Sequence, residues 1–378
     1  MTRMIIVSFF RLGQVKNLVL LLLAFSVSMR PVCSQTKSES NQSELIGKAL
    51  TEIVNDGRSP GMIAAIISAE GVTAAASAGV RKAGSGIAFT TMDVVHLGSC
   101  TKAMTAAMIG TLVAEGKLKW NTKLVDVFPE LKGIIHPDYN TVTLWQLLTH
   151  SAGVPANPTD WDAYGKDEIK ERRLAILKVN LKSPAAFTPG EHHYSNFGYM
   201  IAGCMAERIV GLSWESLMQK RLFDPLGMTS AGFGIPGNPA QIDQPWGHGR
   251  YGDNWRPSLS YDPEAIGPAG EVHCNIQDWA KFLSLWLTGK NAIIDSTILN
   301  KLAQPLGFYA GGWGVSEQPW AKGKVLSHNG SNGIWYATVA VAPKLNRAYV
   351  VVTNSREFGS TEDICRNMLS KLIRMDQN

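Results

Sequence analysis

The chain has 378 residues, of which 45% are hydrophobic and 18% charged, so it is long enough for a large core in one or two domains. Its formal charge of +5 depends on residues 1–34, which contain Arg3, Arg11, Lys16 and Arg30 and no acidic residue. Of the 36 basic residues, 32 remain beyond these four, against 31 acidic residues. This near-neutral balance gives no electrostatic reason to expect nucleic acid as a partner.

Residues 1–34 have the features of an export signal. A basic segment precedes residues 18–29, which carry no charge and are fewer than the roughly 20 apolar residues that a membrane-spanning helix needs. Small residues at Val32-Cys33-Ser34 predict cleavage after Ser34, with Ser26-Val27-Ser28 as a weaker site. An uncleaved signal anchor is the alternative. The sequence thus predicts a periplasmic or secreted protein with no stable membrane span after cleavage.

Five cysteines are spread widely along the chain, and one of them, Cys33, lies in the predicted signal. The other four show no close pair of the Cys-x-x-Cys type, so no zinc site is expected. They are Cys100, Cys204, Cys274 and Cys365. Buried free thiols are the favoured interpretation, with one or two disulfides as the alternative.

The first part of the mature chain mixes helical and strand-like patterns. Residues 35–43 are polar and predict a flexible leader. Apolar residues at helical spacing predict a helix over 44–55, and the strand-like runs 62–68 and 72–78 predict a hairpin. A further helix is predicted over 101–115.

Strand patterns are scarce between about residues 120 and 225, and helices are predicted there instead. The expected helices are 143–148 with Thr143 as its cap, 167–179, 198–210, and a segment that is capped by Ser213 and ends before Asp224. Residues 232–270 are rich in glycine, proline and aromatic residues and predict a long ordered loop region. Long loops inside a domain are often binding or lid elements, or else plain surface loops.

The last part of the chain combines strands with two helices. The expected order is a helix over 275–288, strand-like runs at 311–315 and 325–327, strong strands at 334–342 and 347–353, and a helix that begins at Ser360. The simplest fold is of the α/β (α+β) class, with one antiparallel sheet built from both chain ends and flanked by the terminal helices. Residues 44–105 and 270–378 would form this sheet domain, and residues 106–269 an inserted, mostly helical domain with the long loop region.

A serine and a lysine stand three residues apart in His96-Leu97-Gly98-Ser99-Cys100-Thr101-Lys102, at the start of an apolar helix. Positions i and i+3 share a helix face, so the Ser99 hydroxyl and the Lys102 ammonium would point into the same space. A serine nucleophile needs such a neighbour to remove its proton. Ser34 and Lys37 have the same spacing by chance, but no apolar helix follows them.

Tyr194-Ser195-Asn196 is the second candidate motif, between a Pro-Gly turn and a predicted helix. A tyrosine beside a lysine ammonium can accept the serine proton and later deliver it to a leaving group. The amide of Asn196 would hold a substrate carbonyl or fix Lys102.

His328-Asn329-Gly330-Ser331 is the third candidate motif, directly before the two strong strands. A glycine-containing edge strand lets a substrate backbone lie alongside the sheet. His328 offers a donor to a substrate carboxylate or carbonyl, and the Ser331 and Ser99 N–H groups would form an oxyanion hole. Asn329 and Gly330 complete this predicted substrate-binding strand.

With these three motifs in this order, the sequence resembles the serine β-lactamase and penicillin-recognising D,D-peptidase family. The likeness is closest to its class C-like branch, which includes esterases and D-aminopeptidases, and it covers roughly residues 44–375. Further similar stretches are 147–153, 225–228, and 268–270 before a helix at 278–282. The resemblance implies that Ser99 is acylated, that Lys102 and Tyr194 move protons, and that Asn196 and residues 328–331 contact substrate. For His150 it implies a structural hydrogen-bonding role.

The chain departs from the class C pattern at two motifs. His328-Asn329-Gly330 stands where class C enzymes usually have Lys-Thr-Gly, and Tyr194-Ser195-Asn196 stands where Tyr-Ala-Asn is common. A neutral imidazole is a weaker anchor for a carboxylate than lysine is. Acylation by β-lactams is therefore expected, but efficient hydrolysis of them is not.

The sequence thus predicts an exported serine hydrolase that acts on D-amino peptides or β-lactam-like amides through a Ser99 acyl-enzyme. An esterase on the same scaffold and a non-catalytic penicillin-binding or sensor protein are the alternatives. The expected partner is a small molecule or short peptide, namely a cell-wall peptide, a β-lactam or an ester, and not nucleic acid. No cofactor and no metal are expected, because no cluster of His and Asp ligands is present.

Overall fold

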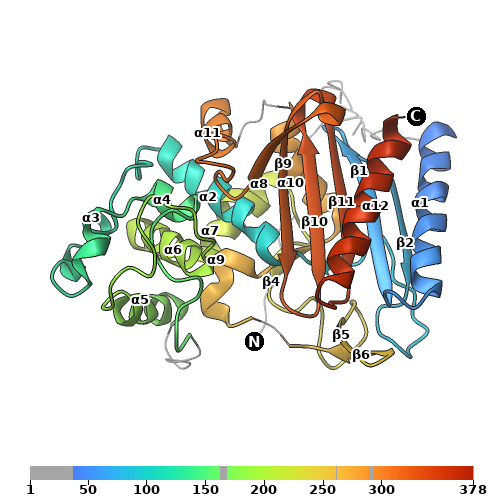
Figure 1. The fold of residues 1–378 in the computed structure, drawn as a ribbon, viewed down its shortest axis with the longest axis horizontal. Coiled ribbons are helices and arrows are strands. Elements are labelled where there is room, and N and C mark those ends of the chain that lie inside the picture. The colour runs from blue at the N-terminus through green and yellow to red at the C-terminus, as the bar shows by residue number, and fades with distance from the viewer. Residues whose placement is uncertain (1–36, 162–167, 261, 289–292, 378) are drawn as a thin grey trace, which may run out of the picture. The chain divides into compact units, whose positions relative to one another are not determined.

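A six-stranded antiparallel sheet joins the two ends of the chain in the computed structural model, which describes residues 37–161, 168–260, 262–288 and 293–377. The predictions for residues 1–34 lie outside the described residues. In sheet order the strands are β2 (Gly71–Gly79), β1 (Gly61–Ser68), β11 (Arg347–Thr353), β10 (Tyr336–Ala342), β9 (Gly323–Ser331) and β8 (Gly314–Gln318). Figure 1 shows the two N-terminal strands in blue beside the C-terminal strands in orange and red. The predicted fold class is confirmed.

The central strands are apolar on both faces because helices cover both sides of the sheet. All eight residues of β1 are buried. Ile63, Ala65 and Ile67 belong to the larger hydrophobic cluster, whereas Met62 and Ala64 belong to a second one on the opposite face. This alternation follows from the two-residue period of a strand.

Two terminal helices cover one face of the sheet, and a third helix covers the other (Figure 1). Helices α1 (Lys37–Asn55) and α12 (Ser360–Gln377) bury Ile46, Leu50 and Met368 in the second cluster. Helix α10 (Ile276–Thr288) packs on the opposite face and contributes Trp279 and Phe282 to the larger cluster. The sheet is therefore the middle layer of a three-layer arrangement, with helices on both faces.

The middle of the chain is mostly helical. Its α-helices are α2 (Thr101–Ala114), α3 (Leu124–Val127), α4 (Leu144–Leu148), α5 (Ile169–Asn180), α6 (Asn196–Val210), α7 (Trp214–Met218), α8 (Asp224–Leu226) and α9 (Gly267–Gly270), with α11 (Ser296–Leu302) added from the C-terminal part. Thr143 caps α4 through the Gln146 N–H, as predicted from the sequence. Ser213 caps α7 in the same way.

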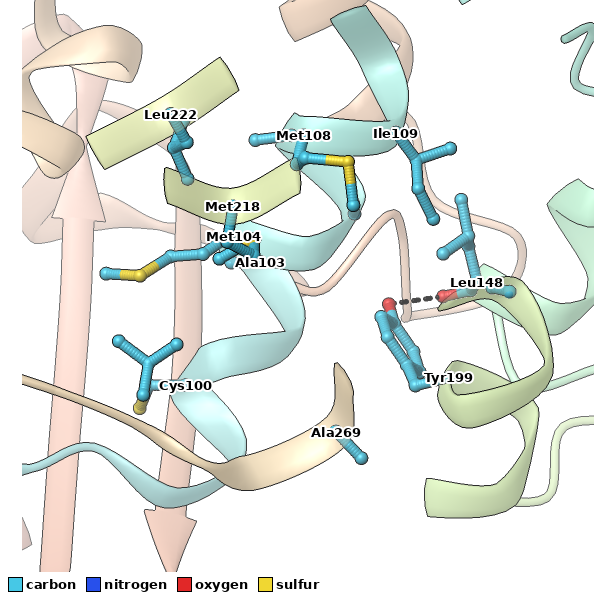
Figure 2. Packing of buried hydrophobic residues seen from close by; sticks show 14 of the residues in the cluster. Cys100, Ala103, Met104, Met108, Ile109, Leu148, Tyr199, Met218, Leu222 and Ala269 are labelled. Carbon is cyan, nitrogen blue, oxygen red and sulfur yellow. Dashed lines mark hydrogen bonds between the residues drawn. The ribbon is translucent and has the colours of Figure 1, made fainter. Parts of the chain in front are cut away.

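Helix α2 is the centre of this arrangement, and twelve of its fourteen residues are buried. Met218 and Leu222 pack on one side of it, and Tyr199 and Leu148 lie on the other, where the Tyr199 hydroxyl donates to the Leu148 carbonyl at 2.8 Å (Figure 2). A helix that is apolar all round must be buried all round. The Ser99 turn at its start is thereby anchored in the core.

Two helical segments differ from their sequence predictions. The leader predicted for residues 35–43 is wrong where the structure describes it: α1 begins at Lys37, and the Gln42 amide donates to the Met375 carbonyl. The segment after Ser213 is not one regular α-helix, because α7 is followed by a π-helical turn, Gln219–Phe223. The four cysteines of the described chain are free and buried, which confirms the favoured interpretation of the sequence.

The loop region predicted for residues 232–270 contains regular structure. The hairpin of β5 (Gly247–Tyr251) and β6 (Asn254–Ser258) lies within it, as does β4 (Gly232–Phe233), which pairs with β7 (Val272–Cys274). Strand β7 also pairs with β3 (Val95–His96), just before the Ser99 turn. These strands are too short to give a sequence pattern, and their pairing depends on residues far apart in the chain.

Candidate active site

Ser99 lies in a single 3-10 turn, Gly98–Cys100, that leads directly into α2. Lys102 follows in the first turn of α2, and its Nζ lies 3.0 Å from the Ser99 Oγ. The predicted i, i+3 geometry therefore brings the two side chains into contact.

Lys102 is fully buried, and three oxygen atoms surround its amine. Besides Ser99, Nζ contacts the Asn196 Oδ1 and the Ala269 carbonyl oxygen, each at 2.7 Å. Burial lowers the pKa of Lys102 to about 7 from its ordinary value of 10.5, although the negative charge of Asp262 acts in the opposite direction. A large fraction of Lys102 is thus a neutral amine at neutral pH.

The three contacts of Lys102 fit an ammonium, which donates to all three oxygens, as well as a neutral amine. The lowered pKa of Lys102 favours the neutral amine above about pH 7. In that form Asn196 and Ala269, whose carbonyl oxygens only accept, take its two N–H donors. Its lone pair is then free to accept the Ser99 hydroxyl proton.

Tyr194 reaches the same serine from the segment before α6. Its ring centroid lies 4.8 Å from the Lys102 Nζ. Burial raises the pKa of the Tyr194 hydroxyl well above its ordinary value, and the neighbouring Ser99 side chain only partly offsets this effect. The residue as a whole is 40% exposed. Tyr194 is therefore a neutral phenol that can donate a proton.

Asn196 is the first residue of α6, and Ser195 is the helix cap through its bond with the Gly198 N–H. The cap fixes the direction of the Asn196 side chain, whose Nδ2 donates to the Asn157 Oδ1 at 2.8 Å. Asn196 thus contacts Lys102, as one of the two roles considered from the sequence requires, and its contact with a substrate stays a prediction.

His150 supports the segment that carries Tyr194. Its backbone carbonyl accepts from the His193 N–H, and its Nδ1 accepts from the Ser195 N–H at 3.1 Å. The imidazole packs against the Tyr194 ring with 4.3 Å between centroids. Burial, together with the charge of Lys102, lowers the pKa of His150 to about 2, so the ring is neutral. Its contacts are those of the structural hydrogen-bonding role that the resemblance implied.

Residues 328–331 form the end of β9, beyond the part of this strand that pairs with β8. Strand β8 pairs with β9 only as far as Ser327, so the following residues have no β8 partner on that side. Gly330 and Gly98 lie where this segment meets the Ser99 turn: a side chain on Gly330 would overlap the Leu97 carbonyl and lie 2.8 Å from the Ser99 nitrogen. Two glycines thus let the strand backbone approach Ser99 closely.

His328 is buried, and both ring nitrogens already have partners. Its Nδ1–H donates to the Asn329 carbonyl at 2.6 Å, and its Nε2 accepts from the Tyr309 hydroxyl at 2.8 Å. Burial and the nearby Lys102 charge lower the pKa of His328 to about 3, so it carries no charge at neutral pH. To bind a substrate group, His328 must exchange one of these bonds. The Asn329 Oδ1 is likewise bonded to the Thr338 hydroxyl.

A small cavity of about 50 Å³ opens beside Ser99. Ser99, Asn196 and Ser331 line it, together with Trp161 and Asp262, which the sequence analysis did not single out. No motif marked those two residues, and only the chain fold brings them to the site. A larger cavity of about 690 Å³ lies elsewhere and contains none of the predicted site residues among its lining.

The family model described as Beta-lactamase matches residues 46–368. The chain belongs to the beta-lactamase family. It is 27% identical over 321 residues to Penicillin-binding protein 4 of Amycolatopsis lactamdurans. The aligned region covers 80% of this chain and 83% of that protein. It is also 32% identical over 160 residues to the Lovastatin esterase of Penicillium rubens, over 37% of this chain and 40% of the esterase.

The fold of this family is also found among solved structures. The structure titled D-alanine carboxypeptidase AmpC from Burkholderia cenocepacia matches with a TM-score of 0.71 and 18% identity, over 88% of this chain and 99% of that chain. In the described part of the chain, no group of three or more His, Cys, Asp or Glu side chains is arranged to hold a metal ion. The described helices include none that is long and apolar enough to cross a membrane.

Proposed function

We propose that this chain is a serine hydrolase that works through a Ser99 acyl-enzyme, on D-amino peptides or β-lactam-like amides. The contacts of Lys102 carry this proposal. A buried amine with a lowered pKa, both N–H groups occupied by carbonyl oxygens and its third contact a serine hydroxyl, is arranged as a general base. A structural lysine would instead have a carboxylate partner or solvent.

In the proposed acylation step, the Ser99 Oγ attacks the substrate carbonyl carbon and its proton passes to the Lys102 amine. Tyr194, a neutral phenol near Lys102, then donates its proton to the leaving group, and the Lys102 ammonium returns a proton to Tyr194. Water attacks the acyl-enzyme with the same groups acting in reverse. Each acid–base group of this kind accelerates a reaction by roughly 10²–10⁴-fold.

The backbone N–H groups of Ser99 and Ser331 are the proposed oxyanion hole. The close approach of Gly330 and Gly98 supports this role, because it brings both backbones to one place. Preorganised N–H donors at such a position are worth about 3–4 kcal/mol in the transition state. The free edge of β9 after Ser327 would hold the substrate backbone.

Labelling with a fluorescent penicillin, followed by mass spectrometry of the Ser99 peptide, tests the proposal. We expect one acyl group on Ser99, and no label on Ser99→Ala. Cys100 is a matched control, since burial raises the pKa of its thiol and Cys100→Ser should label as the wild type does. Absence of a Ser99 adduct, both with penicillin and with an activated ester, would refute the proposal.

An esterase is the second candidate, and the environment of His328 favours it. The imidazole is neutral and bonded at both nitrogens, so it offers no charge to a substrate carboxylate. Similarity to an esterase over part of the chain points the same way. Turnover of short p-nitrophenyl esters well above that of nitrocefin and D-Ala-D-Ala peptides would identify this activity. Stable labelling without any turnover would identify a penicillin-binding or sensor protein.

We also propose that the protein is exported and acts in the periplasm or outside the cell. The basic and apolar patterns of residues 1–34 support this. Cell fractionation with N-terminal sequencing of the mature protein tests it. A protein that keeps Met1 and stays in the cytoplasm would contradict it.

A further inference from the structure

Arg173 is a buried cation that binds the backbone just before α9. It lies on α5, and its side chain is fully buried. Its guanidinium pairs with two carboxylates, since Nη1 donates to the Glu207 Oε1 at 2.6 Å and Nη2 to the Glu215 Oε1 at 2.5 Å. It also binds the main chain, because Nε donates to the Ala265 carbonyl and Nη2 to the Glu264 carbonyl, each at 3.0 Å. The two ion pairs thus hold the guanidinium where it fixes two consecutive carbonyls.

These two carbonyls belong to a short 3-10 turn, Glu264–Ile266, that runs directly into the single helical turn α9. Helix α9 has the sequence Gly-Pro-Ala-Gly, and a four-residue helix with two glycines is not stable on its own. Its position therefore depends on bonds from other elements. Arg173 supplies two of them through the preceding turn, and the Thr105 hydroxyl of α2 donates to the Pro268 carbonyl at 2.7 Å.

Helix α9 presents the Ala269 carbonyl to the Lys102 amine, whose Nζ lies 2.7 Å from it. Figure 2 shows Ala269 on this turn, which packs against α2. Since Ala265 and Ala269 are only four residues apart, a shift of the turn at Arg173 also moves this carbonyl. A gap there would admit water to the amine. Burial is the main cause of the lowered pKa of Lys102, so water at Nζ would raise that pKa.

The turn lies directly against the guanidinium because residue 267 is a glycine. A side chain on Gly267 would come within 2.9 Å of the Arg173 Nη2 and 3.1 Å of the Trp214 ring. Neither neighbour is free to move away. Trp214 is held at both ends, since its backbone N–H donates to the Glu207 carboxylate and its indole N–H to the Thr105 hydroxyl. One buried network therefore joins α5, α6 and α7 to α2 around the start of α9.

We propose that Arg173 is a positioning residue for the base: it holds residues 264–270 so that the Ala269 carbonyl stays on Lys102. This inference rests on the proposed Ser99 acyl-enzyme with Lys102 as its base. A planar guanidinium with five donors can bind two carbonyls and two carboxylates at once, whereas a compact ammonium with three donors cannot. Arg173 thus acts on the reaction through the backbone of α9 and not by contact with the substrate.

The test measures the rate of penicillin acylation from pH 5 to 9 in the wild type and three variants. The first variant combines Arg173→Met with Glu207→Gln, which removes a buried ion pair and leaves the net charge unchanged. The second, Gly267→Ala, pushes the turn off the guanidinium and alters no charge. The third, Arg172→Met, is the matched control, because this neighbouring arginine binds the exposed carboxylate of Glu264 and not the backbone.

In the wild type the rate should rise with pH through about 7, the pKa of Lys102. In the double variant and in Gly267→Ala the midpoint should move up by at least about half a pH unit, because burial outweighs the nearby charges in setting this pKa. The loss of rate should then be larger at pH 6 than at pH 9. Arg172→Met should keep the wild-type midpoint. The ionisable side chains around Lys102 are the same in all four enzymes: Cys100, His150, Tyr194, Asp262 and His328.

A purely structural role for Arg173 would lower the melting temperature and leave the midpoint where it is. An unchanged midpoint in the double variant and in Gly267→Ala would therefore overturn the inference. If the double variant does not fold, the midpoint of Gly267→Ala decides alone. An equal shift in Arg172→Met would also overturn it, because loss of charge on α5 would then be the cause. Wild-type protein that takes no label at Ser99 would instead refute the proposed function, which a fixed midpoint leaves intact.

Discussion

Replacing Lys102 with methionine separates the catalytic benefit of its burial from the cost to stability. The pKa of Lys102 falls from 10.5 to about 7 on folding because its amine leaves water. Between pH 7 and 10.5 the unfolded chain therefore keeps a proton on Lys102 that the folded protein has released. Burial of the charged amine lowers the free energy of unfolding in full below about pH 7, and this loss disappears as the pH rises toward 10.5. A difference of about 3.5 pKa units corresponds to a penalty on the order of 5 kcal/mol.

Methionine has a similar length and no charge, but it leaves the Asn196 and Ala269 oxygens without a donor. That loss costs about 1–3 kcal/mol for each oxygen and does not depend on pH. The difference in unfolding free energy between wild type and Lys102→Met therefore changes with pH in a defined direction. From pH 6 to pH 9 the wild type should gain about 3 kcal/mol relative to the variant.

Urea unfolding of both proteins at pH 6, 7, 8 and 9 measures this difference. Titrations of groups that do not interact with Lys102 cancel, because they are common to both proteins; His150, His328 and Asp262 do interact with its charge, and burial keeps the pKa values of the two histidines below this pH range. The variant should also acylate at least 10²-fold more slowly than the wild type at pH 8. A stability difference that stays flat from pH 6 to pH 9 would refute the assignment of a lowered pKa to Lys102, and with it the argument for a neutral amine.

Three further predictions concern the same site. The rate of penicillin acylation should rise with pH through about 7 and then level off, as Lys102 loses its proton; a stopped-flow series from pH 5 to 9 checks this, and a flat profile contradicts it. Tyr194→Phe should slow turnover by roughly 10²–10³-fold with little change in melting temperature, whereas the control Tyr199→Phe should lose about 1 kcal/mol of stability with its bond to the Leu148 carbonyl. Gly98→Ala should lower the free energy of unfolding, measured by thermal melting, by more than about 2 kcal/mol, because the φ of Gly98 is +50° and the added methyl overlaps the backbone of β9. Gly57→Ala is the control, since Gly57 has a φ of +69° but open space around it, and it should cost about 1 kcal/mol.

The parts of the site that depend on local geometry were predictable from the sequence. Ser99 and Lys102 lie on one helix face, so their spacing alone implied their contact. The hairpin of β1 and β2 and the pairing of β10 with β11 likewise follow from short-range patterns. The convergence of Tyr194 on Ser99 was suggested by motif order, although the distance depends on the whole fold.

Other parts of the site had no readable signal. Ala269 contributes a backbone carbonyl to Lys102, and backbone groups leave no mark on side-chain patterns. Tyr309 bonds His328 from a segment with no motif, and this contact changes what the histidine can do. Asp262 reaches the cavity only because the chain between β6 and α9 folds back toward Ser99. Each of these depends on long-range packing that a single sequence does not encode in a local pattern.

Helix α2 has no free face, and this limits where the protein can vary its chemistry. Ser99 and Lys102 stand at the start of a helix with twelve buried residues, so a change of volume there disturbs the core. The walls of the cavity come from other segments, around Trp161, Asn196, Asp262 and Ser331. Under the proposed mechanism, substitutions in these walls change which acyl group fits and leave the contact between Ser99 and Lys102 in place. Substrate preference can then change through single substitutions in the cavity wall without loss of the proposed chemistry.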